Sequence, residues 1–201
     1  MKLILNSKFL PAQAGQIPNS ERGVTLVEII VVVFIVALFS TIMFNDFPKI
    51  KQQFALSRTA YKFAQDLRAA RDLGMSGVRV LDEQGDPVQA KGYGVFIDLM
   101  AVGGDKKYII YADLNNDQQY TSGIEDYIIE TINLDGSVFI KEIGNIKNQN
   151  VSINFKPPNP NIAITELEDN SARVKIVFAV EINDAITREV YANISGLIEM
   201  K

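Results

Sequence analysis

The pattern of apolar positions divides the chain near its start. Residues 1–22 are mixed and polar and contain no long apolar run, whereas Val24 to Phe44 reads VTLVEIIVVVFIVALFSTIMF, with Glu28 as its one charged residue. A helix of this length spans roughly 30 Å, which matches the hydrocarbon thickness of a bilayer. The pattern therefore predicts a membrane helix over residues 24–44.

Two alternatives to a retained membrane helix fit the pattern less well. A buried core helix is usually shorter and carries a polar stripe, which residues 29–39 lack. A secretory signal peptide is cut after its apolar stretch, at small residues. Here the small residue, Gly23, precedes that stretch, and Asn45-Asp46-Phe47-Pro48 follows it. We therefore expect any cleavage upstream of the apolar helix.

Beyond Pro48 the helical pattern continues in amphipathic form. Apolar or small residues recur at spacings of four and three, at Leu56, Ala60, Phe63, Leu67, Ala70 and Gly74. Glycines at 74 and 77 and a serine between them supply a stop signal. The sequence predicts one long helix over residues 24–77, with its second half packed on a domain.

Residues 78–201 read as short strands separated by turn signals. The strand segments are VRVL, GVFIDL, YIIYA, DYIIETINL and VSINF, followed by alternation from Val174 to Ile182. Asn183-Asp184 then begins a turn, so a C-terminal hairpin is expected. If the long helix lies across the sheet, the helix and the sheet each bury their apolar face. The sequence therefore predicts an α+β fold, with a long N-terminal helix on an antiparallel β-sheet domain.

Composition removes several classes of function. The chain has a net charge of −4 and contains no Cys, His or Trp. It therefore lacks disulfides, thiolate zinc sites, cysteine nucleophiles and histidine bases, and a basic face for nucleic acid is not expected. We expect no enzyme and no nucleic-acid partner.

Glu28 needs an explanation because a carboxylate within a membrane segment costs about 2.5–3.5 kcal/mol at mid-bilayer, and less near an interface. If the chain is cut between Gly23 and Val24, Glu28 becomes the fifth residue of a helix that starts with a charged amine. The terminal amine of a neighbouring subunit can then neutralise it. The alternative is an acid that lies at the membrane interface without a role.

The stretch from Arg22 to Glu28, followed by an unbroken apolar helix, resembles the class III signal of type IV prepilins and pseudopilins. The resemblance implies that a prepilin peptidase cleaves after Gly23 and methylates the amine of Val24, and that Glu28 guides subunit docking. Two features depart from the common pattern: the first mature residue is Val rather than Phe, and the proline of the helix falls late, at Pro48.

The resemblance also implies an organisation and partners. Residues 1–23 are then a prepilin leader, 24–77 the helix with 24–44 as filament core, and 78–201 an extracytoplasmic β-rich domain. The segment DLRAARDLGMS after the membrane helix is similar to minor pilins and pseudopilins with an H-type domain. The implied partners are other subunits, an assembly platform protein and membrane lipid. The implied location is the inner membrane, with a cytoplasmic N-terminus, and later a surface filament of a type IV pilus or type II secretion system.

One loop of the β-rich part has the spacing of a calcium site. Asp113, Asn115 and Asp117 place oxygens at its first, third and fifth positions, with Glu125 further on. It is not a standard EF-hand, because Gln118 replaces the usual glycine and Glu125 comes one residue late. An Asx-rich turn is the alternative.

Other polar motifs have structural explanations. The triplets that begin at Asn150 and Asn193 fit the glycosylation pattern by chance, and the cluster of Asp82, Glu83 and Asp86 is expected at a solvated hairpin tip. A membrane-anchored binding module is the alternative to a filament subunit, and it predicts that Gly23 and Glu28 are dispensable.

Overall fold

The computed structural model describes residues 23–81, 85–123, 125–157 and 162–201. The chain divides into two compact units, Met1–Asn45 and Asp46–Lys201. The helix α1, Leu26–Ser76, has residues in both units. The boundaries expected from the sequence, at residues 23 and 77, stay a prediction.

Helix α1 has a recognisable signal at each end. Thr25 precedes it, and its hydroxyl oxygen accepts a hydrogen bond from the backbone N–H of Glu28, which satisfies one of the free donors of the first turn. The helix ends at Ser76, and Gly77 follows with φ 61°, the left-handed conformation in which glycine commonly terminates helices. Pro48 lies inside the helix, which continues through it.

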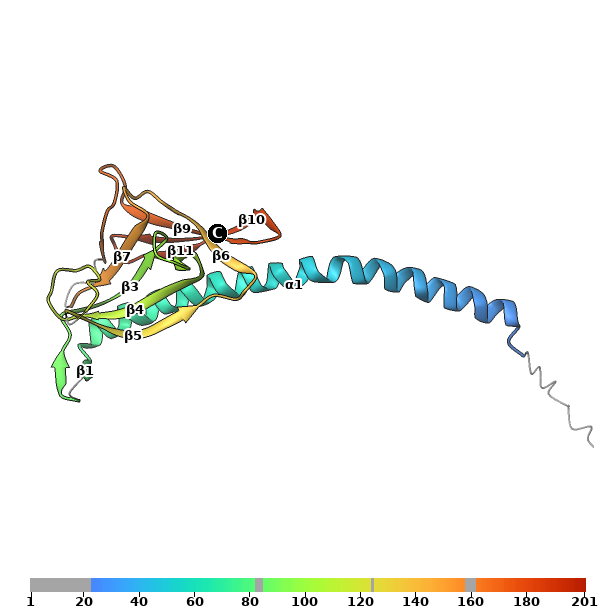
Figure 1. The fold of residues 1–201 in the computed structure, drawn as a ribbon, viewed down its shortest axis with the longest axis horizontal. Coiled ribbons are helices and arrows are strands. Elements are labelled where there is room, and N and C mark those ends of the chain that lie inside the picture. Colours follow the sequence, from blue (N-terminus) through green and yellow to red (C-terminus); the bar gives the residue numbers. More distant parts are fainter. Residues whose placement is uncertain (1–22, 82–84, 124, 158–161) are drawn as a thin grey trace, which may run out of the picture. The chain divides into compact units, whose positions relative to one another are not determined.

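In the described residues the strands form three antiparallel sheets, and the α+β fold class is confirmed (Figure 1). The five-stranded sheet has the order β5 (Asp126–Asn133), β4 (Lys107–Asp113), β3 (Gly92–Asp98), β7 (Asn150–Phe155), β8 (Ile162–Ile164). The four-stranded sheet has the order β11 (Ile198–Met200), β10 (Asn183–Asn193), β9 (Arg173–Val180), β6 (Val138–Gly144). A short ribbon pairs β1 (Arg79–Leu81) with β2 (Pro87–Gln89), and a 3₁₀ turn, η1, covers Gly104–Lys106.

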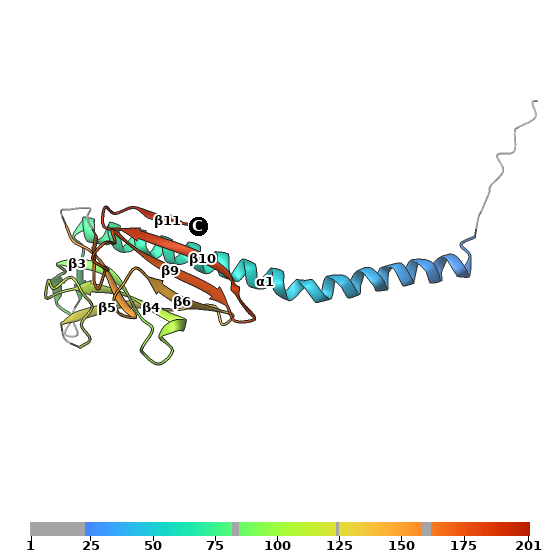
Figure 2. The ribbon, with the colours of Figure 1, turned by 90° about the horizontal axis from the view of Figure 1, so that it is seen from above.

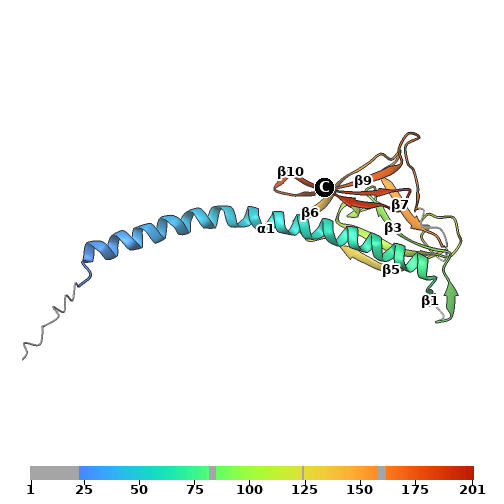
Figure 3. The same ribbon diagram turned by 180° about the vertical axis from the view of Figure 1, so that it is seen from behind.

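The part of α1 from Leu56 onward lies along both larger sheets (Figures 2 and 3). The predicted stripe of this helix is buried: Leu56, Ala60, Phe63, Leu67 and Ala70 all lie in one hydrophobic core with residues of the two sheets. The ring of Phe63 makes edge contacts with Tyr108 of β4, at 5.0 Å between centroids, and with Phe178 of β9, at 5.3 Å. One helical side chain therefore joins the two sheets.

Some strands differ from the expected pattern for a local reason. The strand β6 was not anticipated because a bulge between Ile140 and Glu142 breaks its alternation. At the C-terminus the hairpin turn comes earlier than expected, since Asn183 already pairs with Val180. The residues after Asn183 then bulge out before regular pairing resumes at Thr187.

The two faces of the five-stranded sheet have different chemistry. On β7 the alternate residues Val151, Ile153 and Phe155 enter the core shared with α1. Asn150, Ser152 and Asn154 therefore lie on the opposite face. The sheet thus presents a polar and aromatic face away from the helix, and Phe96, the cross-strand partner of Ser152, belongs to it.

Candidate functional site

The first candidate site is the N-terminal part of α1. Every residue from Gly23 to Phe44 is exposed except Ser40, which is partly so. Among the described residues, α1 is the one helix long and apolar enough to cross a membrane. The hydroxyls of Ser40 and Thr41 donate to the carbonyl oxygens of Val36 and Ala37 at 2.8 and 2.9 Å. These two hydroxyls are satisfied within the helix. The exposed apolar surface around them needs cover from lipid or from other chains.

The residues of the expected cleavage and docking site lie together at the start of α1. The Glu28 backbone nitrogen lies 3.2 Å from the Thr25 hydroxyl oxygen, and that of Ile29 lies 3.2 Å from the Thr25 carbonyl oxygen. In the described part of the chain no cation lies within ion-pair distance of Glu28, whose side chain is exposed. Thr25 was not among the residues predicted for this site, although Thr-x-x-Glu is a recognised helix-start pattern.

Gly23 stands before the helix and is not constrained by packing. A Cβ added at this position would meet no described atom within 4 Å. The fold itself therefore does not require glycine here, and any requirement comes from an external partner. Residues 1–22, the remainder of the expected leader, lie outside the described residues.

The acidic loop after β4 is organised by two buried carboxylates. Asp113 and Asp126 are cross-strand partners at its base and are almost fully buried. Asp113 accepts hydrogen bonds from the backbone N–H groups of Asn116 and Gln118, at 2.5 and 3.0 Å. Asp126 accepts from those of Leu114 and Thr121, at 3.1 and 2.7 Å. We call this pair the carboxylate clamp, because it holds the loop through backbone amides.

The residues expected to bind calcium are partly brought together. The Asn115 side-chain amide donates to Asp117 at 3.0 Å and to Glu125 at 3.3 Å, whereas Asp113 points its oxygens at backbone amides. Within the described residues, no group of three or more Asp, Glu, His or Cys side chains is arranged to hold a metal ion. The calcium site stays a prediction, and the loop has a sufficient explanation in its hydrogen bonds.

The clamp makes a testable contribution to stability. Substituting Asp113→Asn keeps the size of the side chain but replaces one acceptor oxygen with an amide that cannot accept the N–H of Asn116 or Gln118. We expect the free energy of unfolding to fall by about 1–3 kcal/mol at pH 7, the usual cost of a buried unpaired donor. Urea titration of the full chain in detergent, followed by circular dichroism, measures it. Stabilisation of the native chain by added calcium would instead support the calcium site.

The same variant has a defined pH dependence. Burial raises the pKa of the carboxyls of Asp113 and Asp126 above their ordinary value. A raised pKa means that the folded state binds the proton more readily than the unfolded state. The stability contributed by Asp113 is therefore larger in acid and is lost as the pH rises through the folded-state pKa. The difference between native chain and Asp113→Asn should widen as the pH is lowered from 7 toward 4.

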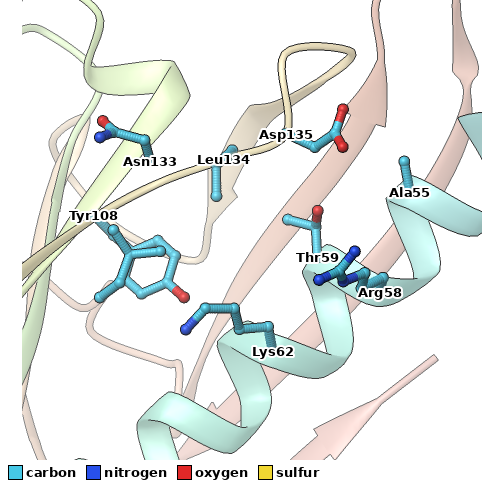
Figure 4. Close-up of a pocket in the computed structure, with 9 residues that line it drawn as sticks. Ala55, Arg58, Thr59, Lys62, Tyr108, Asn133, Leu134 and Asp135 are labelled. Carbon is cyan, nitrogen blue, oxygen red and sulfur yellow. The ribbon is translucent and has the colours of Figure 1, made fainter.

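A cavity of about 300 Å³ lies between α1 and the end of β5 (Figure 4). Arg58 and Lys62 of the helix and Tyr108 of β4 line it, with Asp135 from the turn after β5. Lys62 pairs with Asp66 at 2.8 Å, and Tyr108 donates a hydrogen bond to the same carboxylate. Hydrogen bonds from Ser137, with the charges of Lys51 and Arg58, lower the pKa of Asp135. The charged side chains that line this cavity thus have partners of opposite charge within the chain. Their arrangement does not indicate a particular ligand.

The glycosylation-like triplets and the acidic cluster were the remaining motifs. Asn150 lies in β7, and Asn193 accepts a hydrogen bond from the backbone of Ser195 in the turn before β11. Asp82 and Glu83 lie outside the described residues.

Comparison with known proteins identifies the N-terminal segment. Residues 18–44 match the family model of the prokaryotic N-terminal methylation motif. No curated protein and no solved structure matches the chain significantly. The matched range covers Gly23, Thr25 and Glu28 and the exposed apolar part of α1. The chain therefore carries a class III prepilin signal, the N-terminal signal of type IV pilin-like proteins.

Proposed function

We propose that this chain is a structural subunit of a type IV pilus or of a type II secretion-type filament. Prepilin peptidase removes residues 1–23 and methylates Val24, and the mature chain assembles through its apolar helix. One observation carries the proposal: the methylation motif coincides with the N-terminal part of α1, whose apolar side chains are exposed in the single chain. Such a surface is stable in lipid, and it is equally stable when neighbouring helices bury it in a filament.

Glu28 sets the register between subunits in this proposal. Its carboxylate is exposed in the first helical turn, and in the described residues no cation neutralises it. A charge of this kind is costly in an apolar surrounding unless it is paired. The amine of Val24 from an adjacent subunit supplies the missing partner, because removal of residues 1–23 creates that positive charge.

The finer assignment rests on the layout of the chain. The segment Asp66–Ser76 at the end of α1 leads into a β domain, in the order expected of minor pilins and pseudopilins with an H-type domain. We therefore propose a minor subunit, anchored in the inner membrane with its N-terminus in the cytoplasm before assembly, with an assembly platform protein and other subunits as its partners.

The N-terminal mass of the native protein tests processing. We expect the membrane-derived chain to begin at Val24 and to carry one added methyl group. In Gly23→Val the peptidase meets a bulky side chain at its cut site, so cleavage should slow at least about tenfold, which corresponds to about 1.4 kcal/mol of transition-state binding, and the form that keeps residues 1–23 should accumulate. Intact-mass spectrometry measures both forms.

A second glycine provides the matched control. An added Cβ at Gly136 also meets no described atom within 4 Å, and this residue lies in the turn before β6. Gly136→Val should therefore be processed normally. Mature, surface-exposed protein that still carries residues 1–23 would contradict the proposal and would favour a plain membrane-anchored module.

A further inference from the structure

The outer face of the five-stranded sheet, the one turned away from α1, carries a second, smaller cavity. Its volume is about 180 Å³. Phe96 of β3 and Asn150 and Ser152 of β7 line it from the sheet, Gln119 and Tyr120 from the clamped loop, and Glu166 from the segment after β8. We call this cavity the outer-face pocket. Its described lining contains no glycine, and it lies wholly within the unit Asp46–Lys201.

Both walls of the outer-face pocket are held by hydrogen bonds. The backbone N–H of Tyr120 donates to the Ser152 hydroxyl at 2.8 Å, and the carboxylate clamp fixes the next residue, Thr121. On the other side, the backbone N–H of Ser152 donates to the Thr165 hydroxyl at 2.8 Å. The loop that resembles a calcium site therefore serves to place Tyr120 against the sheet.

The pocket contains an aromatic surface. The rings of Phe96 and Tyr120 lie 4.8 Å apart between centroids, and Tyr120 also contacts Tyr111 at 5.4 Å. Tyr111 is fully buried, whereas Phe96 and Tyr120 are each partly exposed. The buried ring thus supports the partly exposed pair, which adds an apolar surface to the lining of the pocket.

Most polar side chains that line the pocket are uncharged and can both donate and accept hydrogen bonds. Asn148, Asn150 and Gln119 have side-chain amides, which both donate and accept hydrogen bonds. Glu166 is the one charged residue of the lining, and its carboxylate accepts a hydrogen bond from the Asn148 amide at 2.8 Å. Glu166 also has φ 59°, a strained conformation for a side chain other than glycine.

We propose that the outer-face pocket binds one neutral pyranose ring of a glycan. The apolar C–H face of a sugar matches the ring surface, and its hydroxyls, each a donor and an acceptor, match the amides. No lysine or arginine lines the pocket in the described residues, which disfavours a phosphate or carboxylate. A drug-sized ligand generally needs a cavity of about 300 Å³ or more, so one ring fits better than an extended chain. The inference is independent of filament assembly.

A peptide is the less favoured occupant because of where the pocket lies. Extended peptides usually bind along an open strand edge, through backbone hydrogen bonds. The outer-face pocket lies over β3 and β7, which are both interior strands of their sheet. No free edge is therefore available beneath a ligand at this position.

Saturation-transfer NMR on the full chain tests the proposal. The protein is held in dodecylphosphocholine, since sugar-based detergents compete, and glucose, galactose, mannose and N-acetylglucosamine are added in turn. We expect transfer to the ring C–H protons of at least one sugar. Tyr120→Ala should weaken its Kd about tenfold, the effect of losing one aromatic contact. Asn150→Ala should weaken it by a smaller factor.

Two further tyrosine variants serve as controls for the sugar-binding test. Tyr127→Ala removes an exposed tyrosine from β5, outside the pocket lining, and should leave sugar binding unchanged. Tyr120→Phe keeps the ring and should retain most of the affinity even if Tyr120→Ala folds poorly. The proposal is overturned if no sugar receives saturation, if Tyr120→Ala and Asn150→Ala bind as well as the native chain, or if a neutral Gly-Ser-Gly peptide binds and the sugars do not.

Discussion

If the chain is the proposed filament subunit, replacing Glu28 by glutamine is expected to remove it from filaments while leaving it processed and in the membrane. Glutamine has nearly the same size and keeps an oxygen, but it cannot neutralise the charged amine of Val24 that the proposal pairs with Glu28. Breaking one partner of a buried ion pair costs about 3–5 kcal/mol. That cost corresponds to roughly a hundredfold loss or more at equilibrium. Quantifying the subunit in sheared filament and membrane fractions measures the effect.

Two further variants separate pairing from other roles of this segment. Glu199→Gln removes an exposed carboxylate from β11 and should not change assembly. Thr25→Ala removes the helix cap and should cost about 1 kcal/mol of helix stability without the large assembly defect. Assembly of Glu28→Gln at native levels would show that Glu28 acts only at the helix start.

Substituting Phe63→Ala should destabilise the unit Asp46–Lys201 by about 3–5 kcal/mol, the usual range for a buried phenylalanine. Phe63 is fully buried and contacts an aromatic ring from each of the two larger sheets. Its removal leaves a cavity where the helix and both sheets meet. Urea unfolding of the full chain in detergent, followed by circular dichroism, measures the change.

Tyr61 offers a control two residues away on the same helix. Its side chain is 62% exposed. Tyr61→Ala should change the free energy of unfolding by less than about 0.5 kcal/mol, as for most surface substitutions. An equal effect of the two substitutions would contradict the packing of Phe63 against both larger sheets.

The helical stripe was predictable because its signal is local. The spacing of Leu56, Ala60 and Phe63 follows the turn of an α-helix, so adjacent sequence already defines the buried face. The class III signal is equally local, since Gly23 and Glu28 are five residues apart. Thr25 was missed, although its relation to Glu28 is also a matter of short spacing.

The acidic loop shows where local spacing misleads. Oxygen side chains at alternate positions are compatible with a cation site and also with turns that bind their own backbone. The choice depends on Asp126, which reaches the loop only because β4 and β5 pair at its base. Asp113 and Asp126, at the two ends of the loop, therefore both hold its backbone amides. The alternation of oxygen side chains within the loop does not reveal this role.

The sequence by itself determined the membrane-length helix, the prepilin signal, the buried stripe of α1 and the α+β class, because each depends on residue types at short, regular spacings. The tertiary structure alone decided that the strands form two large sheets, that Phe63 joins them, and that Phe96, Tyr120, Asn150 and Glu166 share one pocket. These features arise from pairing and packing between distant segments, where many arrangements satisfy the same local pattern and only burial of a common core selects one.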